Sequence, residues 1–259
     1  MTTAETRTTS LPHLGRYALG LGLMAMGALS LAWGDFVTGQ TVPAALPYRA
    51  ALGELAGAFM FIAGAALAWG RIAPFAAAAV AGYFALVVAV LMNGAEWLSN
   101  VTVYGEYEVA AEQFAIASAA LLIFAETAPL DARLAGRLRR IGQVVFGICA
   151  IVFGGAHFVY MNLTEPLVPK WLPPSQLFWA YATGVAHIIA GIAIATGIRG
   201  RLAGLLLALM YASFQPLVHI PMLLANPANH FEWCENAINL ALAGAAWVIA
   251  DSFGKTTSG

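Results

Sequence analysis

Long apolar runs are the feature of this sequence that most limits what it can fold into. Of its 259 residues, 61% are hydrophobic and only 10% are charged, whereas soluble domains carry about a quarter charged residues. A bilayer core of about 30 Å needs about 20 apolar residues per helix, and the apolar runs recur at that length. They are rich in Ala and Leu without alternation, which favours helices over a barrel. The sequence therefore predicts an all-α, polytopic membrane protein.

Prolines and charged residues divide the apolar chain into eight predicted transmembrane helices. The first follows Arg7 and Arg16 and is longer than the apolar core of a signal peptide, so we interpret it as an uncleaved span. Residues 1–13 and 253–259 then form two short tails. The eight spans are predicted at residues 14–35, 47–70, 73–93, 109–128, 141–163, 177–198, 202–225 and 234–252.

The positions of the basic residues predict the orientation of these spans. Only Arg49 and Lys170 fall on the outer side when both termini are placed in the cytoplasm, which is the distribution that inner-membrane proteins show. We therefore expect a multi-pass protein of a bacterial-type cytoplasmic (inner) membrane, with the loop at 164–176 outside. The remaining basic residues fall on the cytoplasmic side: Arg7, Arg16, Arg71, Arg133, Arg137, Arg139, Arg140, Arg199, Arg201 and Lys255.

The glycine spacing predicts an internal repeat. Three glycines of the first span recur with the same spacing in the fifth, about 127 residues later. We therefore predict two tandem four-helix repeats, residues 14–128 and 141–252, joined by a basic cytoplasmic linker at 129–140. Four spans per unit make the repeats parallel. In this alignment Glu54 holds the place of His187. The matched glycines are Gly15, Gly20 and Gly27 with Gly142, Gly147 and Gly154.

Ionisable side chains inside the apolar spans mark the candidate site, because each costs several kcal/mol unless it is paired or hydrated. At about 1.5 Å per residue, His157 and His219 lie about 9 Å below the outer boundary and His187 about 15 Å below it. Pro216 and Pro221 bracket His219 and predict a kink in that span. The candidate pocket residues are His157, His187, His219 and Glu235, with Glu54, Glu232 and Asn239 in secondary positions.

The residue types at this site leave three interpretations open. Imidazole and carboxylate groups suit a transition metal or haem, in which case His157, His187 and His219 would be the metal ligands. The same groups suit a quinone or another small polar ligand. Alternatively, the histidines hydrogen-bond between helices and have only a structural role. The sequence does not decide between these three.

Motifs in the second half resemble those of the DoxX-like family of small membrane proteins. GGAHF at 154–158 is followed by PLVPKWLP at 166–173 and TGVAHIIAG at 183–191. In the first half the HF and WLP elements are missing, although Glu54 stands in LGELAG. Because members of this family have four spans, the chain resembles a fused pair. The resemblance implies a cytoplasmic membrane location and an association with quinone or thiol redox systems, without a defined reaction.

These observations favour a redox-associated membrane protein with a quinone-like, metal or haem pocket in the outer half of the second repeat. Its partners would be membrane lipids and a redox partner protein. The alternatives are a proton- or cation-coupled transporter of small molecules and a non-catalytic membrane scaffold. The net charge of -1 provides no basic stripe for nucleic acid. Whether the chain is an enzyme is not decided by these patterns.

Overall fold

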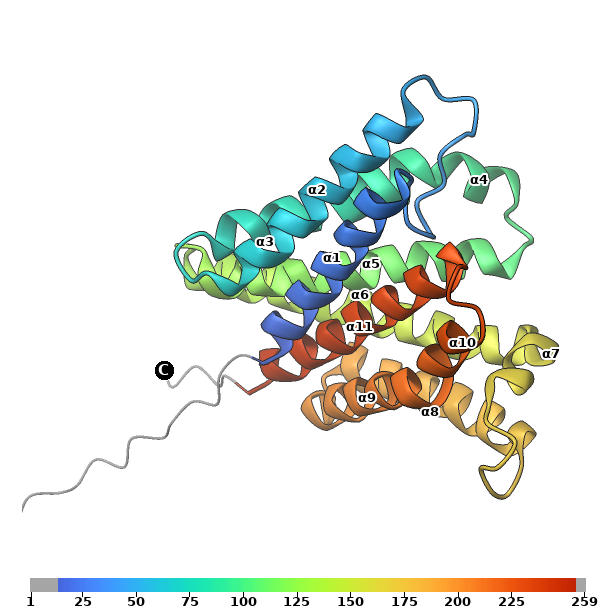
Figure 1. Ribbon diagram of the computed structural model, residues 1–259. Helices are drawn as coiled ribbons and strands as arrows, with labels where there is room; N and C mark the ends of the chain where they lie inside the picture. The colour runs from blue at the N-terminus through green and yellow to red at the C-terminus, as the bar shows by residue number, and fades with distance from the viewer. Residues whose placement is uncertain (1–13, 255–259) are drawn as a thin grey trace, which may run out of the picture.

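The protein is a bundle of long helices, described here by a computed structural model for residues 14–254 (Figure 1). No β-strand occurs among these residues. The remaining residues, 1–13 and 255–259, hold most of the predicted tails and lie outside the described part. Seven helices of the described part are long and apolar enough to cross a bilayer. The chain is therefore a multi-pass helical membrane protein.

The first half of the chain contains four long helical segments. Its last helix begins at Tyr104, five residues before the predicted start, so Glu106 lies in the first helical turn, where a negative charge is favourable. The elements are α1 (Leu14–Trp33), α2 (Arg49–Ala68), α3 (Ala73–Gly82) with the π-helix η1 (Tyr83–Met92), the short α4 (Gly94–Ser99), and α5 (Tyr104–Thr127).

The second half also contains four long helical segments. Its first helix begins at Ala132, so most of the predicted linker is helical, because the Asp131 side chain accepts a hydrogen bond from the Leu134 N–H and caps the helix. The elements are α6 (Ala132–Val159), the short α7 (Met161–Thr164) and η2 (Glu165–Leu167), α8 (Gln176–Thr196), α9 (Gly200–Phe214) with η3 (Gln215–His219) and α10 (Ile220–Ala225), and α11 (His230–Ser252).

A π-helical segment interrupts the third long helix of each half. In the second half this segment is η3, which contains Pro216 and ends at His219, just before Pro221. A proline cannot donate to the carbonyl four residues earlier, and π-helical turns are one way to absorb that loss. The Gln215 side chain donates to the Asn236 carbonyl of α11 at 2.9 Å and fixes η3 against that helix.

The two halves interlock instead of standing apart. α1 packs against α2 of its own half and α11 of the other, and α6 packs in the same way against α8 and α5. α5 and α11 also contact each other, and Figure 1 shows the long helices running side by side. The first helix of each half therefore packs on the fourth helix of the other, and residues from both halves meet at the centre.

Glycines allow the first two long helices of each half to cross closely. A Cβ atom added to Gly20 would lie 2.6 Å from the Gly64 carbonyl oxygen, and one added to Gly147 would lie 2.6 Å from the Gly191 carbonyl oxygen. Such surfaces allow backbone contact where lipid supplies no hydrophobic drive. The second crossing of each pair joins Gly27 to Gly57 and Gly154 to Gly184.

The register of these crossings corrects one prediction. Every glycine of the α6–α8 crossing lies 127 positions after its counterpart in the α1–α2 crossing. By that spacing Met60 corresponds to His187, and Glu54 corresponds to Tyr181. The predicted equivalence of Glu54 and His187 was therefore wrong by six residues, because Gly57 crosses at the place of Gly184.

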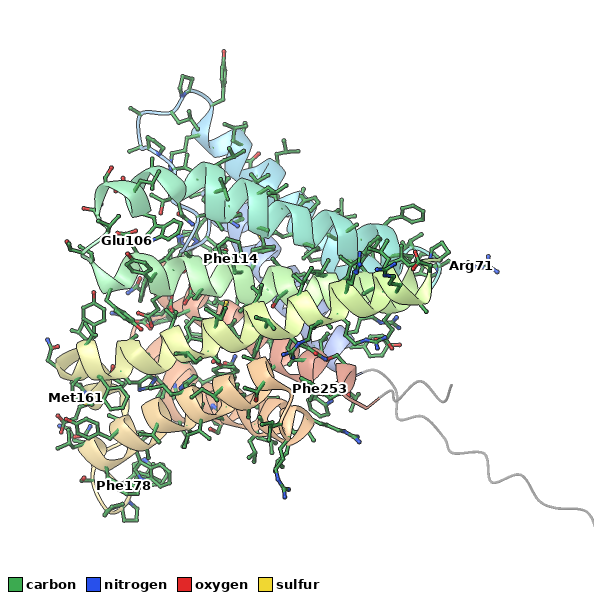
Figure 2. The ribbon with its side chains drawn as sticks, turned by 180° about the vertical axis from the view of Figure 1, so that it is seen from behind. Arg71, Glu106, Phe114, Met161, Phe178 and Phe253 are labelled. Atoms are coloured by element: carbon green, nitrogen blue, oxygen red, sulfur yellow. The ribbon has the colours of Figure 1, made fainter. Side chains whose placement is uncertain are left out.

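The two ends of the bundle differ in the residues that they carry. Figure 2 shows Glu106, Met161 and Phe178 at one end and Arg71 and Phe253 at the opposite end. In Figure 1 the start of α1 and the end of α11 lie on the same side of the bundle, away from α4 and α7. We refer to these as the Glu106 end and the Arg71 end.

Candidate functional site

A cavity of about 140 Å³ lies between the two halves, and we call it the inner cavity. All four predicted pocket residues line it: His157 from α6, His187 from α8, His219 from η3 and Glu235 from α11. Asn239, predicted in a secondary position, lines it as well. The fold thus brings these side chains together, and their role in binding stays a prediction.

The other two predicted positions lie elsewhere. Glu54 is exposed on α2 and Glu232 is half-buried in the first turn of α11, and neither lines the inner cavity. Glu54 had been expected to face the bundle interior because a carboxyl group in an apolar span is costly. It lies only one turn after the start of α2 at Arg49, near the Glu106 end of the bundle.

His157 and His187 stand against each other with their ring centres 5.2 Å apart. The Nδ1 atom of His187 lies 2.8 Å from the Thr183 carbonyl oxygen, and that of His157 lies 3.2 Å from the Ala180 carbonyl oxygen. A carbonyl only accepts, so Nδ1 of His187 carries the proton and Nε2 of the neutral ring carries a lone pair, while His157 Nδ1 also lies 3.2 Å from the Thr183 hydroxyl. The two rings are therefore in contact although the sequence placed them about 6 Å apart in depth.

Tyr211 is a site residue that the sequence analysis missed. It lines the inner cavity from α9, is 3% exposed, and its ring lies 5.4 Å from that of His187. Among the described residues its hydroxyl has no hydrogen-bond partner. Asn239 Nδ2 donates to the Tyr211 backbone carbonyl at 2.8 Å. This bond joins α11 to α9 and leaves the Tyr211 hydroxyl without a partner in the described chain. A buried unpartnered hydroxyl costs about 1–3 kcal/mol, so this group calls for a ligand or a water.

Two carboxyl groups from the first half also line the inner cavity. Glu108 and Glu112 are one helical turn apart on α5 and join Glu235 there. Glu108 lies 127 positions before Glu235, the same spacing as the glycine crossings. The i, i+4 pair on α5 was visible in the sequence. Its assignment to a cavity of the second half was not, because that depends on α5 packing against α6.

The connection between α1 and α2 enters the bundle and contacts the site. Phe36, Val37 and Gln40 are buried, and Thr38 Oγ1 donates to Glu235 Oε1 at 3.0 Å. Gly39 has φ +79° and closes on α5, where a Cβ would lie 2.7 Å from Gln113 Nε2. This connection therefore positions a carboxyl group of the inner cavity from the other half of the chain.

The same connection occupies the first half at the place that corresponds to the inner cavity. Gln40 is 4% exposed, and its Nε2 donates to the Met60 sulfur at 3.4 Å. By the spacing of the glycine crossings, Met60 holds the place of His187. The Gln40 side chain thus lies where the second half has the inner cavity beside His187.

Metal ligation finds no support in this geometry. Within residues 14–254, no group of three or more His, Cys, Asp or Glu side chains is arranged to hold a metal ion. Neither Lys nor Arg lines the inner cavity among the described residues. The cavity is therefore a set of hydrogen-bonding and proton-holding groups.

A second cavity of about 420 Å³ adjoins the inner cavity, and we call it the vestibule. The two share the side chains of Glu108, His157, Phe214 and His219. Most of the other vestibule residues are apolar, and Tyr160, Thr164 and Thr183 add three hydroxyl groups. A ligand at the inner cavity would therefore have an apolar space next to its polar contacts.

Residues 146–250 match the sequence profile of a family described as a domain of unknown function (DUF8561). The match begins in α6 and ends in α11, so it includes every lining residue of the inner cavity that the second half supplies. Searches of the curated proteins and of the solved structures find no match.

Proposed function

We propose that the protein binds the polar ring of a quinone-like, membrane-dissolved molecule in the inner cavity. The observation that carries this proposal is the buried Tyr211 hydroxyl, which has no partner among the described residues and lies at a cavity lined by three imidazole and three carboxyl groups. A buried polar group without a partner is costly. A ligand with hydrogen-bonding groups on a small ring would satisfy it.

The size and chemistry of the inner cavity fit such a ring. At about 140 Å³ it is comparable with cavities of about 150 Å³ that bind benzene. The Tyr211 hydroxyl donates to a quinone carbonyl, and the Nε2 lone pair of a neutral His187 accepts from a quinol hydroxyl. Carboxyl and imidazole groups at the same cavity hold the protons that the two forms exchange. The DoxX-like resemblance supports this redox association and a redox partner protein.

The test is ligand binding to the purified full chain in lipid nanodiscs, measured by isothermal titration with a benzoquinone that carries a decyl tail. His187→Phe keeps a ring and removes Nε2. Loss of one hydrogen bond leaves its buried partner unpaired, at a cost of about 1–3 kcal/mol, which predicts an affinity about 5- to 150-fold weaker. The control is His230→Phe, because His230 stacks on Trp33 at 5.0 Å and lines neither cavity. Absence of saturable binding to the unaltered protein would refute the proposal.

The carboxyl groups favour a second candidate, a proton- or cation-coupled transporter. Glu108, Glu112 and Glu235 gather at one cavity, and intramembrane carboxyl groups commonly relay protons or hold cations. Proteoliposomes with an imposed sodium or proton gradient test this candidate. Gradient-driven movement of the cation that is lost in Glu112→Gln, while quinone binding is absent, would favour transport over the first candidate.

We also propose that α11 is the eighth transmembrane span. It is 23 residues long and contacts α1, α5 and α9, so both halves surround it. Its polar side chains, Glu235 and Asn239 among them, face the interior and lower its mean hydropathy. A span with an interior polar face is expected where a membrane protein builds a site.

Two parallel four-helix repeats are part of the same proposal. The equal spacing of the glycine crossings and the matching packing of α1 on α11 and α6 on α5 support it. Four spans in each repeat place both chain ends at the Arg71 end, which we propose to be cytoplasmic by its basic residues. The Glu106 end then faces the outside of a bacterial-type inner membrane, and the inner cavity lies in the outer half.

A further inference from the structure

The vestibule continues into a groove between α8 and the α9–η3 segment. Thr183, Phe214 and Val218 line both the vestibule and this groove, which has a volume of about 370 Å³. A second groove of about 370 Å³ follows along the same two helices, and Ala186 and Met210 line both grooves. The inner cavity, the vestibule and the two grooves thus form a series in which each space shares side chains with the next.

The packing of the helices explains why this groove exists. α8 packs chiefly on α6, and α9 packs chiefly on α11, so the seam between α8 and α9 is less closely packed than its neighbours. On the α8 side the seam is lined by alanines, which leave space: Ala182, Ala186, Ala190 and Ala193. Ile189 and Leu206, which line the second groove, are 62% and 55% exposed, so the seam faces the lipid.

The groove is long and apolar. From Trp179 to Ala193 it follows α8 for about 21 Å at about 1.5 Å per residue. Its one charged lining residue within the described chain is Arg199, at the Arg71 end. Such apolar walls suit a hydrocarbon chain. The inner cavity, at the other end of the series, offers hydrogen-bonding groups for a polar ring instead.

We infer that the α8–α9 groove holds the apolar tail of the ligand and that its ring enters the inner cavity sideways from the bilayer. The inference rests on the proposed function and makes the substrate class narrower: a quinone with a long alkyl or isoprenoid tail. The tail lies along Ala186 and Met210, and the ring passes Thr183 and Phe214 into the vestibule. Because each space shares side chains with the next, we assign the groove to the ligand's own tail and not to a bulk lipid chain.

The experiment compares two ligands with two variants in the same nanodiscs. The ligands are the decyl-tailed benzoquinone and the same ring without a tail. Ala186→Phe fills the groove where its two parts meet, and the control Val185→Phe adds the same ring to an adjacent position that lines neither groove. Ala186→Phe should weaken binding of the tailed ligand at least tenfold and leave that of the tailless ring within twofold. Val185→Phe should leave both unchanged.

Two results would overturn the inference. One is unchanged binding of the tailed ligand to Ala186→Phe, which means that only bulk lipid fills the groove. The other is an equal loss for both ligands, which means that the tail has no place of its own there. If neither ligand binds the unaltered protein, the proposed function fails as well, so the two failures are distinguishable.

A second measurement covers the case that Ala186→Phe does not fold. A benzoquinone whose tail ends in a photoreactive diazirine is bound to the unaltered protein and cross-linked. The labelled peptides should lie in α8 or α9, and excess decyl-tailed benzoquinone should suppress the labelling. Labelling spread over all lipid-facing helices, or insensitive to the competitor, would contradict the inference.

Discussion

Tyr211→Phe is the substitution that separates the proposed site from an ordinary buried tyrosine. The change removes one hydroxyl that is buried and unpartnered among the described residues, and it keeps the ring that packs against His187. An unpartnered buried hydroxyl costs about 1–3 kcal/mol, so its removal should stabilise the ligand-free protein by about 1 kcal/mol. At this chain length that raises the melting temperature by about 2–4 °C.

The same substitution should have the opposite effect on the ligand complex. The ring of the ligand loses a hydrogen bond worth about 0.5–1.5 kcal/mol, which weakens the affinity for the tailed benzoquinone about 2- to 13-fold. Thermal unfolding in detergent, followed by circular dichroism with and without ligand, measures both effects. The stabilisation by a saturating ligand should therefore be smaller in Tyr211→Phe than in the unaltered protein.

A matched control exists in the first half of the chain. The Tyr83 hydroxyl is also buried, but the Gln40 side chain lies within its reach, and Tyr83 lines neither the inner cavity nor the vestibule. Tyr83→Phe should therefore not stabilise the ligand-free protein as Tyr211→Phe does, and it should leave ligand affinity unchanged. If Tyr211→Phe instead lowers the melting temperature without ligand, its hydroxyl has a partner in the folded protein, and the argument for an unsatisfied site is refuted.

Three further predictions follow from other contacts. Thr38→Val removes the bond to Glu235 Oε1 at 3.0 Å and should lower stability by about 1 kcal/mol and weaken ligand binding. Thr196→Val, whose hydroxyl bonds to backbone atoms at the end of α8, should not change binding. Gly191→Ala places a Cβ 2.5 Å from the Gly147 carbonyl oxygen and should lower stability by about 1–3 kcal/mol. The control Gly136→Ala adds a Cβ to α6 that meets nothing within 4 Å and should raise stability by about 0.5–1 kcal/mol. Equal melting temperatures of the two variants would contradict the close α6–α8 crossing. Lys170→Cys should react with an impermeant maleimide added outside, and Arg71→Cys should react only after the membrane is permeabilised. The background should be low because Cys149 and Cys234 are buried. The reverse labelling pattern would contradict the proposed orientation.

The sequence by itself determined the helical membrane class and most helix boundaries. Hydropathy is a local property, so apolar runs of about 20 residues define helices wherever they pack. The same reasoning placed His157, His187 and His219 in spans, because a helix rises by a fixed distance per residue. It also selected Glu235 and Asn239, which the i, i+4 spacing places on one face of the last helix.

Only the tertiary structure decided which helices share the inner cavity. Glu108 and Glu112 join the histidines because α6 packs on α5 of the other half, and Tyr211 stood out only when its hydroxyl was found buried without a partner. Thr38 reaches Glu235 across 197 positions of the chain. Such contacts depend on how one helix face fits another, and the residue spacing within a single helix does not predict which helices pack together. The pairing of Glu54 with His187 was misread for the same reason, since the backbone contacts of Gly57 with Gly27 and of Gly184 with Gly154 set it, not the order of glycines along the chain.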